Sequence, residues 1–274
     1  MLRVLGVYRE REFSPGRSAA DAAIIDAVLK RLQTAGAAVS TLTAAQMLHR
    51  TVGGFDLVLA MCQSEAALAR LAALQQAGTL VINSPHAIRS CYRDRLGDAL
   101  KACAAPVPQG VLVATAQGLD RDRLGAIDAR RGVYVKRGDL HALCADDVLR
   151  VGDEAGLAQA LARFAARGVR LAYVQAAVEG SVIKFYGVTG TGYFSVADAA
   201  VGVPAGLHEA AHSAAVALGL EVWGGDAIVN GQQFKLVDFN DWPSFERVRA
   251  QAADAIARRA LHLMRERRPA PEEN

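Results

Sequence analysis

Short apolar runs alternate with helical apolar spacing over the first 88 residues, and this alternation constrains the fold more than any other feature. Runs typical of buried strands occupy residues 2–8, 39–42, 55–60 and 80–82, and helical spacing occupies residues 19–35 and 65–77. Strands that alternate with helices in this way pair in parallel, because each helix returns the chain to the same edge of the sheet. We therefore expect an N-terminal α/β domain over residues 1–88, with a parallel sheet covered by helices.

The rest of the chain has the pattern of two α+β units. For residues 89–178, helices are predicted at 93–104 and 154–166 and strands at 110–114, 133–136, 148–151 and 171–176. For residues 179–267, strands are predicted at 182–188, 192–197, 221–229 and 233–240, and helices at 207–218 and 245–267. The Asn230-Gly231 pair between two apolar strands indicates a hairpin. Residues 268–274 are expected to be a frayed tail.

Composition excludes several classes of protein. A formal net charge of +3 over 274 residues is too small for a nucleic-acid-binding surface, and no apolar stretch reaches the length of a membrane span. The four cysteines contain no Cys-x-x-Cys pair, which argues against structural zinc and against a disulfide framework. A cytoplasmic enzyme with small-molecule partners is the simplest reading. The oligomeric state stays open, a homodimer included.

Three oxygen-bearing side chains converge on the C-terminal hairpin. Asp226 lies on its first strand, and Asp238 and Asn240 lie two positions apart on the returning strand, so they share a face. Mg²⁺ prefers such oxygen ligands and commonly combines one or two carboxylates with substrate phosphates. The alternative is that the two aspartates are ordinary solvent-facing residues, although Asp and Asn are poor strand formers in an apolar strand beside Pro243.

This Gly-x-Asp, hairpin, Asp-x-Asn-x-x-Pro pattern resembles the metal-binding end of the ATP-grasp superfamily. The three-part layout resembles it too, since its members bind Mg²⁺-ATP between two α+β subdomains behind an N-terminal parallel-sheet domain. The resemblance implies an ATP-grasp fold with ATP and one or two Mg²⁺ ions as cofactors. Asp226, Asp238 and Asn240 would hold the metal.

The apolar strand that ends at Gln175 is similar to the interdomain hinge of this superfamily. The resemblance assigns adenine contacts to the hinge residues Gln175, Ala176, Ala177 and Val178. Lys184 on the following strand resembles a phosphate-directed catalytic lysine of the inositol polyphosphate kinases. The alternative is a surface lysine on an edge strand, but this chain uses arginine for most of its cations.

Two further basic positions resemble phosphate ligands of the superfamily. Lys136 closes an apolar strand where members place a lysine on the ATP phosphates, and Arg95 matches a basic residue that approaches the nucleotide. The five-residue spacing from Lys136 to His141 again resembles the inositol polyphosphate kinases, with His141 near the transferred phosphate. A structural histidine is equally compatible with this position. The expected glycine-rich loop is represented by Gly138 alone.

The loop after the first strand is the predicted substrate site. Ligands bind at the carboxyl edge of open α/β sheets, where this loop lies before a helix N-terminus. We expect it to bind an anionic substrate group through its arginines: Arg9, Arg11 and Arg17. The alternative is a solvated cluster in which Glu10 and Glu12 neutralise the arginines.

The resemblance leaves two reactions open, both of which transfer the γ-phosphoryl group of ATP to a small anionic substrate. A small-molecule kinase is slightly favoured, because no arginine lies between Lys184 and Arg247 to hold an acyl phosphate. Ser244 also stands where relatives carry glycine, which would narrow the acceptor pocket. The alternative is an ATP-dependent carboxylate–amine ligase similar to the glutamate-ligase-like members. A non-catalytic ATP-binding protein is the third reading.

Overall fold

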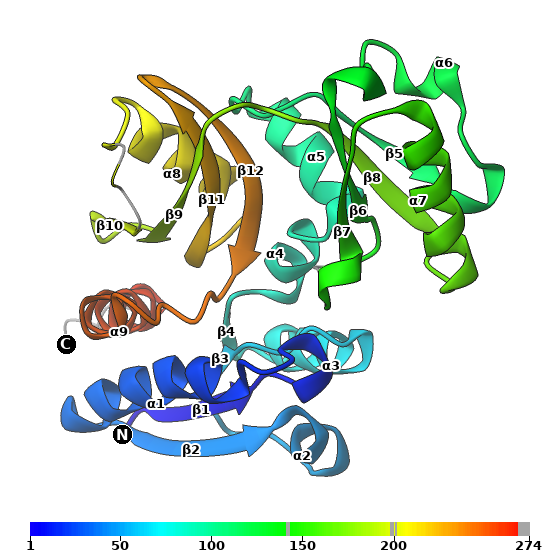
Figure 1. The fold of residues 1–274 in the computed structure, drawn as a ribbon. Coiled ribbons are helices and arrows are strands. Elements are labelled where there is room, and N and C mark those ends of the chain that lie inside the picture. The colour runs from blue at the N-terminus through cyan, green and yellow to red at the C-terminus, as the bar shows by residue number, and fades with distance from the viewer. Residues whose placement is uncertain (141–142, 198–199, 201, 268–274) are drawn as a thin grey trace.

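Three four-stranded sheets, arranged as three lobes, form the protein in the computed structural model (Figure 1). The structure describes residues 1–140, 143–197, 200 and 202–267. In the described part of the chain, no helix is both long and apolar enough to cross a membrane.

The N-terminal sheet is parallel, as predicted, with strand order β2-β1-β3-β4. Its strands are β1 (Arg3–Tyr8), β2 (Ala38–Thr43), β3 (Leu57–Ala60) and β4 (Leu80–Ile82), and its main helices are α1 (Ser18–Thr34) and α3 (Glu65–Gln76). The central strand β1 is buried over Val4–Val7 because helices cover both faces. The α/β reading of this domain is therefore confirmed.

Two short helices of this region were not predicted, although each has a start signal in the sequence. Helix α2 (Ala44–His49) begins with a capping box in which Thr43 and Gln46 bond reciprocally. Helix α4 (Pro85–Ser90) has Ser84 as its N-cap and Pro85 in its first turn. Their apolar pattern is too short to show helical periodicity.

The central and C-terminal sheets are antiparallel, as expected for α+β units. The central sheet has the order β5-β8-β6-β7, with strands β5 (Gly110–Ala114), β6 (Val133–Arg137), β7 (Val148–Val151) and β8 (Leu171–Ala176), and α7 (Glu154–Ala166) covers it. The C-terminal sheet has the order β10-β9-β11-β12, with strands β9 (Ser181–Val188), β10 (Tyr193–Ala197), β11 (Val222–Asn230) and β12 (Gln233–Asp241), and α8 (Leu207–Ala217) covers it.

Two helices pack outside the lobe that their sequence position suggests. Helix α5 (Arg93–Ala102) buries Leu96 and Leu100 in the core of the C-terminal sheet. Helix α9 (Arg249–Glu266) packs on α1, and one hydrophobic core joins it to the N-terminal domain and to the C-terminal sheet (Figure 1). The lobes are thus held together by helices contributed across them.

The last helix begins four residues later than the predicted start at Phe245. Trp242 and Phe245 have left-handed backbones, with φ of 45° and 50°, and both side chains are fully buried in the core between the lobes. This turn replaces the predicted first helical turn, because both aromatic side chains insert into the core.

A buried asparagine ties the N-terminal domain to the C-terminal sheet. The Asn83 side chain donates to Val222 O at 2.7 Å and accepts from Glu221 N and Val222 N at 2.8 and 2.9 Å. Trp242 Nε1 donates to Ile82 O at 3.0 Å. These bonds fix the end of β4 against the start of β11, and so fix the carboxyl edge of the parallel sheet beside the predicted metal residues.

Candidate active site

Three charged side chains, Lys184, Asp226 and Asp238, form one row across the C-terminal sheet, called the acidic row below. In the strand register Asp226 of β11 lies opposite Lys184 of β9 on one side and Asp238 of β12 on the other. Directly opposed residues point to the same face of a sheet. Lys184 Nζ donates to Asp226 Oδ1 at 2.8 Å.

The next row on this face contains Asn240. It is paired with Gly224, which is paired in turn with Tyr186. A Cβ atom at Gly224 would lie 2.8 Å from Pro243 Cγ and 3.2 Å from the Tyr186 ring. Pro243 and the Tyr186 ring therefore occupy the space that a side chain at position 224 would need, between Asn240 and Tyr186.

This residue set fits a Mg²⁺ site that substrate phosphates complete. Burial raises the pKa of Asp226 above its usual range, Lys184 opposes that rise, and the Asp238 carboxylate adds to it. A divalent cation bound by the carboxylates of Asp226 and Asp238 and the amide oxygen of Asn240 would offset the cost of burying their charge. The described residues contain no group of three or more His, Cys, Asp or Glu side chains able to hold a metal by themselves.

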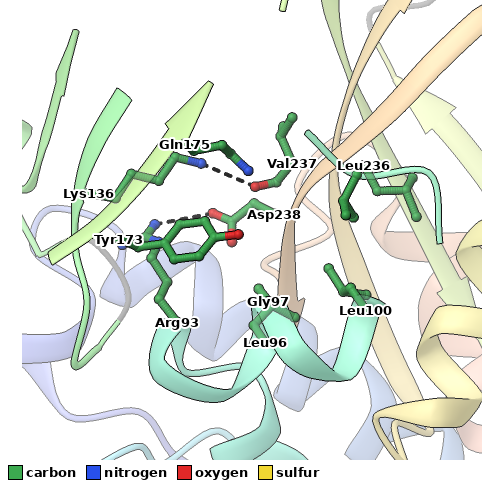
Figure 2. A pocket seen from close by; sticks show the side chains of 11 residues that line it. Arg93, Leu96, Gly97, Leu100, Lys136, Tyr173, Gln175, Leu236, Val237 and Asp238 are labelled. Carbon is green, nitrogen blue, oxygen red and sulfur yellow. Dashed lines mark hydrogen bonds and ion pairs between the residues drawn. The ribbon is translucent and has the colours of Figure 1, made fainter. Parts of the chain in front are cut away.

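The predicted nucleotide residues Lys136 and Gln175 line a narrow pocket between the central sheet and β12 (Figure 2). Helix α5 forms its floor through Arg93, Leu96 and Gly97. The pocket encloses only about 20 Å³, room for a single water molecule. An adenine ring therefore requires the central sheet and β12 to separate.

Two cations bridge this pocket. Lys136 is 8% exposed and its Nζ donates to Val237 O of β12 at 3.2 Å. Arg93 is 6% exposed and donates to Arg137 O and Leu140 O at 3.3 Å, and to Asp238 Oδ2 at 3.4 Å. Burial lowers the pKa of Lys136, and the Asp238 carboxylate counteracts that shift. Both cations therefore place positive charge inside this narrow pocket.

Other nucleotide candidates lie elsewhere. Arg95 is exposed and does not line the pocket, whereas Arg93, two positions earlier, does. Ala176, Ala177 and Val178 do not line it either, and the N–H groups of Ala176 and Ala177 donate to Gln109 O and Gly132 O. His141 lies outside the described residues.

Arg93 lines the pocket but was not among the nucleotide residues predicted from the sequence. The signal was present, because Arg93 shares one helical face with apolar residues at positions 96 and 100 and with a glycine at 97. A cation on the buried face of an amphipathic helix needs a partner, and here that partner is a predicted metal ligand.

A larger cavity of about 420 Å³ adjoins the acidic row. It gathers predicted residues from distant parts of the sequence: Arg9, Arg17, Lys184, Asp226, Asn240 and Ser244. The loop after β1 supplies one wall, and Leu143 and Cys144 supply another. The structure thus brings the predicted substrate loop to the predicted metal site.

The three arginines of the substrate loop have different environments. Arg9 is largely committed to the fold, because it donates to Met61 O at 3.1 Å and Trp242 O at 2.8 Å and pairs with Asp21 at 3.5 Å. Arg11 is exposed and lies outside the cavity. Arg17 lines the cavity and forms no ion pair with any described residue.

Solved structures with this fold include proteins that are named ligases and synthetases. The D-alanine–D-alanine ligase of Bacillus anthracis complexed with ATP has a TM-score of 0.72 at 12% identity, over 97% of this chain and 99% of that one. The D-cycloserine synthetase DcsG has a TM-score of 0.68 at 17% identity, over 94% and 99%. A RimK domain ATP-grasp protein of Sphaerobacter thermophilus has a TM-score of 0.67 at 20% identity, over 94% and 99%.

The chain therefore has the ATP-grasp fold over nearly its whole length, which confirms the predicted fold class. No protein-family model matches the sequence, and no curated protein matches it. The similarity to inositol polyphosphate kinases that the lysine positions indicated is not confirmed, and the similar structures carry the names of ligases and synthetases instead.

Proposed function

We propose that the protein is an ATP-dependent carboxylate–amine ligase that acts through an acyl phosphate. The observation that carries the proposal is the acidic row of Lys184, Asp226 and Asp238. Asp238 lines the narrow pocket that contains Lys136, and Lys184 and Asp226 line the 420 Å³ cavity. Similar folds that carry the names of ligases favour this reaction over the kinase reaction.

The residues have distinct roles in the proposed reaction. Lys136 and Arg93 bind the ATP phosphates after the central sheet and β12 separate. Asp226, Asp238 and Asn240 would hold Mg²⁺, and the metal would supply positive charge to offset the charge of the transferring phosphoryl group. Lys184 lies beside that group and stabilises the negative charge that develops on it.

The proposed reaction has two steps. A carboxylate oxygen of the substrate attacks the γ-phosphorus, the bond to the β-phosphate oxygen breaks, and ADP leaves with the bonding electrons. An amine then attacks the acyl carbon, the bond to the phosphate oxygen breaks, phosphate leaves, and the amine loses a proton. The cavity beside the acidic row is where we place the acid.

Hydroxylamine trapping tests this proposal, because hydroxylamine converts an acyl phosphate into a stable hydroxamate and leaves a phosphate ester intact. The protein is incubated with Mg²⁺-ATP and a panel of small carboxylic acids and alcohols, and ADP and hydroxamate are measured together. We expect ADP and hydroxamate in equal amounts with at least one acid. ADP with a phosphorylated alcohol and no hydroxamate would establish the kinase reaction instead.

A further inference from the structure

The acidic groups around the 420 Å³ cavity are already neutralised by the protein. Asp21 is 4% exposed, accepts from Ser14 Oγ at 2.5 Å, and pairs with Arg9 at 3.5 Å. Asp226 pairs with Lys184 at 2.8 Å and belongs to the proposed metal set. No carboxylate among the described lining residues is therefore left to receive a substrate ammonium group.

The acidic residues of the loop after β1 are also unavailable. The Glu10 carboxylate accepts from the backbone N–H groups of Gln63 and Ser64 at 3.0 and 3.1 Å, next to the first turn of α3. Glu12 does not line the cavity. Neither glutamate lines the cavity, so this loop places no glutamate carboxylate on its wall.

One cation that lines the 420 Å³ cavity has no ion-pair partner among the described residues. Arg17 is the one cation among the described lining residues without an ion pair, since Arg9 and Lys184 have theirs. The Tyr186 hydroxyl lies within electrostatic reach of Arg17 and of Arg247, and both cations oppose the burial that raises its pKa. Arg17 reaches the cavity from the N-terminal domain, opposite the acidic row on the C-terminal sheet.

We infer that the acid this site activates carries a second anionic group and no ammonium group, in the manner of a short dicarboxylate. This inference rests on the proposed ligase function. One carboxylate lies at Lys184 and the metal residues, and the second pairs with the Arg17 guanidinium, whose planar fork suits a carboxylate. The cavity of about 420 Å³ has room for a small acid.

The test compares acids of equal length that differ in charge at the far end. Hydroxamate formation is measured with succinate against β-alanine and with glutarate against γ-aminobutyrate, and butyrate serves as the neutral reference. We expect kcat/KM for each dicarboxylate to exceed that of its amino partner by at least about tenfold, as for a charged hydrogen bond. Equal or greater hydroxamate formation with the amino acids would overturn the inference and leave the ligase function standing. Absence of hydroxamate with every acid would instead refute the ligase function.

Variants of the arginine loop separate recognition from folding. Arg17→Gln should raise KM for succinate about tenfold, and Arg17→Glu should shift the preference toward β-alanine. Arg11→Gln is the matched control, because Arg11 lies on the same loop but outside the cavity. Thermal unfolding of each variant checks that the fold is intact. Equal effects of the Arg17 and Arg11 variants would contradict a specific role for Arg17.

Discussion

Asp238 lies where the C-terminal sheet faces α5 and the central sheet. It accepts from Arg93 of α5, and its charge acts on Lys136 of the central sheet and on Asp226 beside it. Removal of this negative charge therefore affects the proposed metal site and the two cations that line the narrow pocket, Arg93 and Lys136. Asparagine keeps the size of the side chain, so the substitution isolates the charge.

We predict that Asp238→Asn lowers ATP turnover at least about 100-fold, equivalent to about 2.7 kcal/mol of transition-state stabilisation. The reason is the loss of a metal carboxylate while the pocket still binds nucleotide. ADP release and Mg²⁺ dependence are the measurements. Asp122→Asn on the exposed helix α6 (Arg121–Leu124) is the control and should retain full activity. Full activity in Asp238→Asn would remove this residue from the metal set.

Arg93 and Arg95 offer a second comparison, because they are close in sequence but differ in environment. Arg93→Gln should raise KM for ATP about tenfold or more, because its guanidinium lies in the pocket and bonds Asp238. Arg95→Gln should change KM less than about twofold, because that side chain is exposed. ATP titration of turnover measures both. The opposite order would restore the assignment made from the sequence.

At the scale of elements, strand positions were easier to predict than helix ends and hinge contacts. The hairpin of β11 and β12 could be predicted because Asn-Gly turns and period-two alternation are local properties. The start of α9 could not, because burial of Trp242 and Phe245 between lobes is a tertiary effect. The contacts of Ala176 and Ala177 could not be predicted for the same reason. Their backbone N–H groups donate to Gln109 O and Gly132 O, which directly precede β5 and β6 of the central sheet.

Strand β11 tolerates no side chain at Gly225. A Cβ atom there would lie 2.3 Å from Asp238 O and 2.5 Å from the Phe185 ring. We predict that Gly225→Ala lowers the free energy of unfolding by about 2 kcal/mol, because β12 must move away from β11. Gly152→Ala is the matched control, since a methyl group at that position would have no neighbouring atom within 4 Å. Urea unfolding compares them, and equal stabilities would contradict the close strand packing.

The segment that follows β6 is held by a buried carboxylate. Asp147 accepts from Leu143 N at 2.8 Å and from Arg167 at 2.6 Å, and it is fully buried. Burial acts to raise the pKa of Asp147, but the backbone N–H of Leu143 and the Arg167 guanidinium outweigh it, so the pKa is lowered. A lowered pKa means that the carboxylate stabilises the fold at pH values above the ordinary pKa of about 3.9, and that this stabilisation is lost as pH falls through the lowered pKa.

We predict that Asp147→Asn costs about 2 kcal/mol of unfolding free energy at pH 7, because charge-assisted hydrogen bonds are lost. The difference from the parent protein should shrink as pH falls below about 4, where the carboxyl group of the unfolded parent becomes protonated, and it should be lost once pH falls through the lowered pKa of the folded state. Urea unfolding at several pH values measures this. Asp146→Asn is the control, since that carboxylate is exposed and should contribute little. A pH-independent difference would show that Asp147 acts through packing alone.

At the scale of the whole molecule, the parallel domain and the C-terminal sheet are joined by a common core and by Asn83, and the central sheet closes on them through Lys136 and Arg93. The sequence predicted the three-part layout and the residues that converge on the acidic row. It could not predict that Arg9 and Arg17 line the cavity and that Arg9 is paired with Asp21, because both depend on how the lobes pack. We propose that a carboxylate oxygen of the substrate attacks ATP where these lobes converge.

The transfer of labelled oxygen from the acid to phosphate tests this proposed attack. The acid identified by hydroxamate trapping is labelled with ¹⁸O in the reacting carboxylate and incubated with Mg²⁺-ATP and an amine acceptor. An acyl phosphate intermediate transfers one carboxylate oxygen to the inorganic phosphate, because the amine expels phosphate with that oxygen attached. We predict one ¹⁸O atom in each phosphate released, measured by mass spectrometry. Unlabelled phosphate formed together with the amide product would contradict an acyl phosphate intermediate.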